Sequence, residues 1–154
     1  KWHVARVYMQ IVEQPDIFLR EPTSEVKLPL SVEDQVIIDL MIDTMYKNNG
    51  IGLAANQVGY ARRIFVMDTS TDHNSPKIFI NPVIEKLAKE KLTEEEGCLS
   101  CPKKLEEVRR SIYVGLKWTC THGKEQYKTF YYLPSRVVQH EMDHLNGKLI
   151  IDPS

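Results

Sequence analysis

The sequence predicts an α+β fold in which short mixed or antiparallel sheets pack around a central helix. Two segments have helical periodicity, one after a capping box at Ser31 and one between Pro134 and Gly147. Between them lie several short runs rich in branched and aromatic residues, which are typical of strands. A chain of 154 residues is expected to form one domain that buries roughly two-thirds of its unfolded surface.

The first helix is predicted by its start signal. Ser31-Val32-Glu33-Asp34 has the character of a capping box, and apolar residues follow at helical spacing from Val36 to Met45. We expect this helix to run to about Lys47 and to stop at Gly50, because glycine commonly ends helices.

The strands are expected in the middle of the chain. Branched and aromatic residues favour strands over 63–68 and 77–80, and Asn81-Pro82 is expected to end the second. Further strands are predicted over 83–88, 107–118 and 126–132, with a turn at His122-Gly123 between the last two.

The second helix carries the most informative motif in the chain. Pro134 suits a first turn and Gly147 suits a C-cap, so the helix spans the sequence Gln-His-Glu-Met-Asp-His-Leu-Asn-Gly at 139–147. His140 and His144 are four residues apart and therefore lie on one helix face, close enough to share a metal ion. Glu141 can act as general base for a metal-bound water.

The register of this helix predicts a buried site. Leu133, Val137 and Leu145 share the stripe that carries the two histidines, so that stripe is expected to face the core. An ordinary amphipathic helix with two surface histidines is the alternative interpretation of the motif alone.

A catalytic site of this type needs a third protein ligand. The extended motif of some metallopeptidases would place a histidine at position 150, where the chain has Ile150, and only Asp152 offers a downstream carboxylate. The strongest upstream candidate is Cys98, whose thiolate is a good ligand for zinc or iron and whose neighbour Gly97 allows a tight turn. A buried structural cysteine is the alternative.

A third segment, Gly50-Ile51-Gly52-Leu53-Ala54-Ala55-Asn56-Gln57, combines two glycines with a neutral amide. Glycines let backbone approach a ligand closely, and the Gln57 amide is a suitable donor to a developing oxyanion. By itself the segment is typical of a helix C-cap and turn.

Together these segments resemble the peptide deformylase family: Gly-Ile-Gly-Leu-Ala-Ala-x-Gln, then Glu-Gly-Cys-Leu-Ser, then Gln-His-Glu-x-Asp-His-Leu-x-Gly. The resemblance covers essentially the whole chain. It implies a metal-dependent hydrolase that removes the formyl group from the N-terminal formyl-methionine of nascent peptides and releases formate. It also implies one divalent metal ion, Fe2+ in the native enzyme, with Zn2+, Ni2+ or Co2+ able to occupy the same site.

The resemblance assigns expected roles to individual residues. The metal ligands are Cys98, His140 and His144, and the catalytic groups are Glu141, the Gln57 side chain and the backbone N–H of Leu99. Substrate is expected to contact backbone at Ile51, Gly52 and Gly97 and a methionine pocket lined by Leu133 and Val137. Behind the ligands, Arg110 is expected to pair with Glu96.

Composition limits the partners. The chain has 20 basic and 21 acidic residues and a formal charge of −1, so nucleic-acid binding is not expected. No apolar stretch approaches the length of a membrane span, so membrane binding is not expected either. The basic pairs Arg62-Arg63, Lys103-Lys104 and Arg109-Arg110 are predicted to be solvated and to support at most a transient ribosome contact. Three cysteines favour a reducing compartment: the cytoplasm of a bacterium or a phage-infected cell, or an organelle stroma or matrix.

Two features depart from the family pattern. The printed sequence stops at Ser154, so we expect a single catalytic domain over 1–154 that lacks an extended C-terminal helix. Cys101 creates a Cys-x-x-Cys pair with Cys98, which opens the alternative of a closed structural zinc site with His140 and His144. A thioredoxin-like redox pair is disfavoured because no βαβ pattern surrounds it, and a metallo-amidase of other specificity is a further alternative.

Overall fold

The structure, a computed structural model, describes residues 8–153, so the predicted domain 1–154 extends past the described residues at both ends. Its helices are η1 (Ile17–Arg20), α1 (Val32–Lys47), η2 (Ala55–Val58) and α2 (Leu133–Leu145). Its strands are β1 (Gly52–Ala54), β2 (Ile64–Met67), β3 (Lys77–Leu87), β4 (Lys91–Cys98), β5 (Cys101–Ser111), β6 (Tyr113–Thr119) and β7 (Glu125–Tyr131). The predicted α+β class is confirmed.

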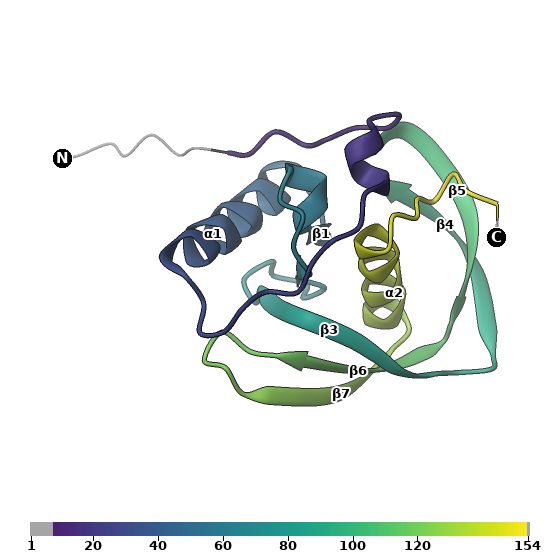
Figure 1. Ribbon diagram of the computed structural model, residues 1–154. Coiled ribbons are helices and arrows are strands. Elements are labelled where there is room, and N and C mark those ends of the chain that lie inside the picture. Colours follow the sequence, from purple (N-terminus) through teal and green to yellow (C-terminus); the bar gives the residue numbers. More distant parts are fainter. Residues whose placement is uncertain (1–7, 154) are drawn as a thin grey trace.

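The strands form two antiparallel sheets (Figure 1). One has five strands in the order β1-β2-β3-β6-β7, and the other is the β4-β5 pair. Helix α2 lies between the two sheets, whereas α1 covers the other side of the larger sheet near β1. Because β1 is the end strand of its sheet, one of its edges has no strand partner among residues 8–153.

Strand β2 shows how the core is divided. Phe65 and Met67 pack in the cluster that includes α2, whereas Ile64 and Val66 pack in the cluster that includes α1. Successive strand side chains point to opposite faces, so a strand covered on both faces is apolar throughout. Among the described residues, no helix is long and apolar enough to cross a membrane.

Both predicted helices are confirmed. Ser31 and Asp34 form the reciprocal capping box of α1, and Gly147 follows α2 with a left-handed φ of 75°. The predicted stop at Gly50 is wrong in its detail, because the left-handed residue after α1 is Asn49, with φ 57°. Asparagine tolerates this conformation, so the helix ends before the glycines are reached.

The predicted strand boundaries are wrong at two places. Strand β3 runs through Asn81-Pro82, since a register shift between Ile80 and Val83 absorbs the proline and the Asn81 amide bonds the backbone of Val26. The single strand predicted over 107–118 divides at Ile112, and its two parts, β5 and β6, belong to different sheets. The prediction missed β4, whose mostly exposed, charged residues lack an apolar alternation.

The candidate metal centre

Three side chains from distant parts of the chain converge on one point. Cys98 ends β4, and His140 and His144 lie one turn apart on α2. The His144 Nε2 atom is 3.2 Å from Cys98 Sγ and 3.2 Å from His140 Nε2. Cys98 is half-buried and His144 is fully buried, so the cluster lies at the base of a cavity rather than on the surface.

The spacing of these atoms suits a metal ion. A tetrahedral ion with ordinary zinc–nitrogen and zinc–sulfur bonds would separate two nitrogens by about 3.3 Å and nitrogen from sulfur by about 3.6 Å. One thiolate and two imidazoles form a donor set suited to zinc or iron. The three ligand atoms lie within 4.8 Å of one another, so the residues present fit a divalent ion with an open fourth position.

Cys101 does not join this group. Among residues 8–153 the potential metal ligands that converge here are Cys98, His140 and His144, whereas Cys101 packs with Leu19, Leu149 and Ile150. Burial, followed by the charge of Cys98, raises the pKa of the Cys101 thiol to about 12. The closed four-ligand site is therefore not supported, and all three cysteines are free.

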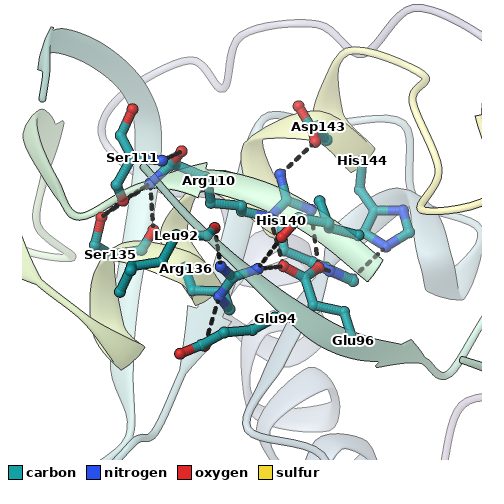
Figure 2. A network of polar contacts seen from close by, with 12 residues as sticks. Leu92, Glu94, Glu96, Arg110, Ser111, Ser135, Arg136, His140, Asp143 and His144 are labelled. Carbon is teal, nitrogen blue, oxygen red and sulfur yellow. Dashed lines mark hydrogen bonds and ion pairs between the residues drawn. The ribbon is translucent and has the colours of Figure 1, made fainter. Parts of the chain in front are cut away.

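A buried carboxylate orients the first histidine (Figure 2). Glu96 Oε1 lies 2.9 Å from His140 Nδ1, so the ring donates its Nδ1–H to the carboxylate and directs Nε2 toward the cluster. Arg110 donates to both oxygens of Glu96 at 2.7 and 2.9 Å and to Asp143 at 2.8 Å. Burial opposes the charge of Glu96, but bonds to His140 and Arg110 lower its pKa to about 2.

The pKa values of the two histidines shift in opposite directions. Burial alone would lower the pKa of His140, but hydrogen bonding to Cys98, the charge of Glu141 and the bond to Glu96 raise it to about 10. Burial and the charge of His140 hold the pKa of His144 well below its usual range. The two adjacent imidazoles therefore do not both carry a positive charge.

Two arginines behind the cluster correct or extend the sequence prediction. The prediction that Arg110 is solvated with its neighbour is wrong, because its side chain is only 7% exposed and pairs with Glu96 and Asp143. Arg136 was missed, although it donates to Glu96, to Glu94 and to the backbone carbonyls of β4 and β5. Its position four residues before His140, on the same helix face, is the signal that could have found it.

Glu141 lies against the backbone of β1. Its Oε1 is buried and has no hydrogen-bond partner within residues 8–153, and burial raises the pKa of the carboxyl to about 7. A Cβ added at Gly52 would be 2.5 Å from Glu141 Oε2 and 2.7 Å from Val137 Cγ1. Glycine at position 52 thus lets the strand approach the motif helix closely.

Gln57 is held rigidly beside the cluster. Its Oε1 accepts the Ala54 N–H at 2.9 Å, and its Nε2 donates to Ser100 Oγ at 3.0 Å and lies 3.8 Å from Cys98 Sγ. These contacts point the amide nitrogen toward the Cys98 thiol. Leu99 follows Cys98 in the turn between β4 and β5, and its backbone N–H donates to no backbone acceptor within residues 8–153.

A cavity of about 770 Å³ opens above these groups. The remaining predicted site residues, Ile51, Gly52, Gly97, Leu133 and Val137, all line it together with Glu96, Cys98, His140 and Glu141. The predicted tight turn at Gly97 is wrong, because Gly97 lies in β4 at an irregularity of pairing between Glu96 and Cys98. Leu133 was expected to face the core, but it begins α2 and is 48% exposed at the cavity.

Comparisons with known proteins agree on one family. The family model for polypeptide deformylase matches residues 8–154. The peptide deformylase of Pseudothermotoga lettingae is 44% identical over 137 residues, which are 89% of this chain and 77% of that protein. Peptide deformylase 1 of Pseudomonas syringae pv. tomato is 43% identical over 94% of this chain and 85% of its own length. The crystal structure of peptide deformylase from Thermotoga maritima superposes with a TM-score of 0.90 at 39% identity, covering 96% of this chain and 97% of that chain.

Proposed function

Since this chain belongs to the polypeptide deformylase family, it removes the N-formyl group from nascent peptides, and we propose that Cys98, His140 and His144 hold the metal ion of this reaction. The observation that carries the assignment is the convergence of two imidazole nitrogens and a thiol at the base of the cavity. When bound, the metal lowers the pKa of a water in its open position and polarises the formyl oxygen.

We propose Fe2+ as the native metal, with Zn2+, Ni2+ or Co2+ able to replace it. The support is the mixed thiolate and imidazole donor set, which suits iron and zinc alike, together with the family resemblance. We expect protein purified without oxygen to contain iron and to lose activity in air. Equal activity of the iron and zinc forms, with no oxygen sensitivity, would remove the case for iron.

Glu141 is the group we assign to proton transfer. Its buried Oε1 takes a proton from the water that attacks the formyl carbon and then delivers it to the departing amine nitrogen. The carbon–nitrogen bond breaks, and the products are formate and a peptide with a free N-terminus. A carboxyl whose pKa burial raises to about 7 is suited to accept and return a proton near neutral pH.

Two donors are positioned to stabilise the oxyanion. The amide of Gln57 is oriented by Ala54 and Ser100, and the N–H of Leu99 lies in the adjacent turn. Because the Gln57 amide is held before substrate arrives, it needs little reorganisation as charge develops on the formyl oxygen. Removing one such donor commonly costs about 3 kcal/mol in the barrier.

The peptide is proposed to bind as an added strand. Gly52 begins the edge strand β1, Ile51 precedes it with its carbonyl bonded to the Asp68 N–H, and both line the same cavity as Gly97 in β4. An extended peptide can pair with such edges through its main chain, independent of sequence. Its first side chain would then enter the space lined by Leu133 and Val137, which suits unbranched methionine.

The direct test is Glu141→Gln, which removes the proposed base and none of the proposed ligands. We expect the variant to retain its metal and to lose nearly all turnover of a formyl-Met-Ala-Ser peptide. Glu107→Gln, at an exposed position of β5, makes the same chemical change away from the site and should leave turnover unchanged. Near-normal hydrolysis by Glu141→Gln would refute the assignment.

We also propose the cytoplasm as the compartment and no more than a transient contact with the ribosome. The substrates are nascent peptides, and the three cysteines are free, as expected under reducing conditions. The exposed Arg62, Lys103 and Lys104 supply local positive charge, but the chain's formal charge of −1 gives no basis for nucleic-acid binding as a main function.

A further inference from the structure

Cys101 is a cysteine that the proposed catalytic chemistry does not use. It is 1% exposed and packs with Leu19, Leu149 and Ile150, where another small apolar side chain would also fit. It nevertheless lines the substrate cavity together with Cys98, and Cys98 packs against the same apolar cluster. A buried thiol thus lies beside a proposed metal ligand without belonging to the ligand group.

The backbone places these two thiols opposite each other. Cys98 ends β4, Cys101 begins β5, and the two residues are direct partners in the antiparallel pairing on either side of a two-residue turn. Opposite residues of such a pair have side chains on the same face and Cα atoms about 4.5–5.5 Å apart. Disulfides require a Cα separation of about 4.4–6.8 Å, so the two sulfurs can bond without a large movement of the chain.

The turn between the two cysteines is held in place by other segments. The Ser100 carbonyl accepts the Gln14 N–H at 2.8 Å, and Ser100 Oγ accepts the Gln57 amide N–H at 3.0 Å. These bonds keep Cys98 and Cys101 close together. A disulfide across so short a loop adds little stability, because the entropy that it removes from the unfolded chain grows with loop length. Such a bond suits a reversible change better than a permanent crosslink.

We propose that Cys98 and Cys101 form a reversible disulfide when the protein meets a hydroperoxide, and that this modification stops catalysis. The cavity gives a small peroxide access to half-buried Cys98, whereas Cys101 is buried and reacts second. A disulfide sulfur is no longer a thiolate and therefore no longer a metal ligand. The loss of catalysis rests on the proposed function, which makes Cys98 a ligand, but the formation of the disulfide does not.

The reaction balances with hydrogen peroxide as the oxidant. The Cys98 sulfur attacks one peroxide oxygen and the O–O bond breaks, which gives a sulfenic acid and one water that takes the thiol proton. The Cys101 sulfur then attacks the Cys98 sulfur, the S–O bond breaks, and the hydroxide leaves with the Cys101 proton as a second water. Without Cys101 the sulfenic acid would be oxidised further to sulfinic and sulfonic acids, which thiol reductants do not reverse.

The experiment exposes the nickel-loaded protein to hydrogen peroxide and afterwards to dithiothreitol with Ni2+. Nickel is used because Fe2+ itself reacts with peroxide. We expect wild type to lose turnover of formyl-Met-Ala-Ser, its metal and two of its three free thiols. Mass spectrometry should show the loss of two hydrogen atoms and a crosslink between Cys98 and Cys101. Dithiothreitol with Ni2+ should restore most of the turnover.

Three variants isolate the role of Cys101. Cys101→Ala should have normal metal content and turnover before treatment, but peroxide should add oxygen atoms to Cys98, and dithiothreitol should not restore turnover. Cys101→Val, which fills more of the apolar site, should behave in the same way and serves if the alanine variant folds poorly. Cys120→Ala is the matched control, because Cys120 does not line the cavity, and it should recover like wild type.

The outcomes separate this proposal from the proposed function. Recovery of both Cys101 variants to the wild-type level would overturn the disulfide, as would oxygen added at Cys98 of wild type without a crosslink to Cys101. A crosslink from Cys98 to Cys120 would also overturn it. Failure of untreated wild type to hydrolyse formyl-Met-Ala-Ser would instead overturn the proposed function, while the thiol count and the mass would still decide whether the disulfide forms.

Discussion

Replacing Gly52 by alanine tests how closely β1, the proposed substrate-binding strand, must approach the proposed base. The added Cβ would lie 2.5 Å from Glu141 Oε2, 2.7 Å from Val137 Cγ1 and 3.1 Å from Glu141 Cδ. Ordinary contact begins at 3.4 Å, so either the carboxylate or the strand must move by about 0.9 Å. Val137 cannot easily yield, because it is buried and its branched side chain has one favoured rotamer in a helix.

A displacement of this size has a large expected effect on turnover. Misplacing a reacting group by about 1 Å can cost about 100-fold in rate, which corresponds to about 2.7 kcal/mol in the barrier. Crowding a packed core typically costs about 1–3 kcal/mol of stability. We therefore expect Gly52→Ala to lower kcat about 100-fold, to lower the melting temperature by several degrees and to retain its metal.

The assay is steady-state hydrolysis of formyl-Met-Ala-Ser, with metal content and melting temperature measured on the same preparations. Gly123→Ala is the control, because Gly123 has φ 79° in a surface turn and an added Cβ meets nothing within 4 Å. Its alanine variant should lose about 1–2 kcal/mol of stability through backbone strain and keep full activity. A Gly52→Ala enzyme with kcat within about twofold of wild type would refute the close-approach argument.

Two further predictions concern metal retention and acid stability. Cys98→Ser should abolish tight metal binding, whereas Cys101→Ala should keep metal and turnover, because Cys101 packs outside the ligand group. The measurement is the metal content per protein molecule of each variant. Loss of metal from Cys101→Ala would contradict the three-ligand centre. Asp68 has a pKa of about 2, because bonds from Ser70, Tyr46 and Ser75 outweigh the opposing effect of burial. Between about pH 4 and pH 2 the unfolded chain therefore binds more protons than the folded protein does. The stabilising contribution of Asp68 is complete above pH 4 and should be lost as the pH falls through this range. In denaturant titrations, the free energy of unfolding of Asp68→Asn should fall less between pH 4 and pH 2 than that of wild type. An equal fall in both proteins would contradict this account.

The helices and the ligand motif were predictable because their signals are local. The capping box at Ser31 and Asp34 is formed by residues three positions apart, and His140 and His144 share a face through helical periodicity alone. Strand boundaries were less predictable. The division at Ile112 depends on which sheet each half joins, and the charged sequence of β4 has no alternation to reveal it.

The reasons for individual glycines also depended on the tertiary structure. The sequence predicted a helix end at Gly50, a close approach of backbone to a ligand at Gly50 and Gly52, and a tight turn at Gly97. The structure instead places Asn49 in the left-handed conformation, packs Gly52 against Glu141 and leaves Gly97 within a strand. A glycine allows both unusual backbone angles and close contacts, and only the neighbouring atoms distinguish these two uses.

The sequence by itself determined the family, the fold class and the identity of the candidate ligands, because residue type and spacing along one helix or loop are properties of the chain. Only the tertiary structure decided that Cys98, 46 residues from His144, reaches the same point and that Cys101 does not. It alone showed Arg136 fixed against β4 and β5. Contacts of this kind join segments far apart in sequence, and they form only when the folded chain places α2 against β4 and β5.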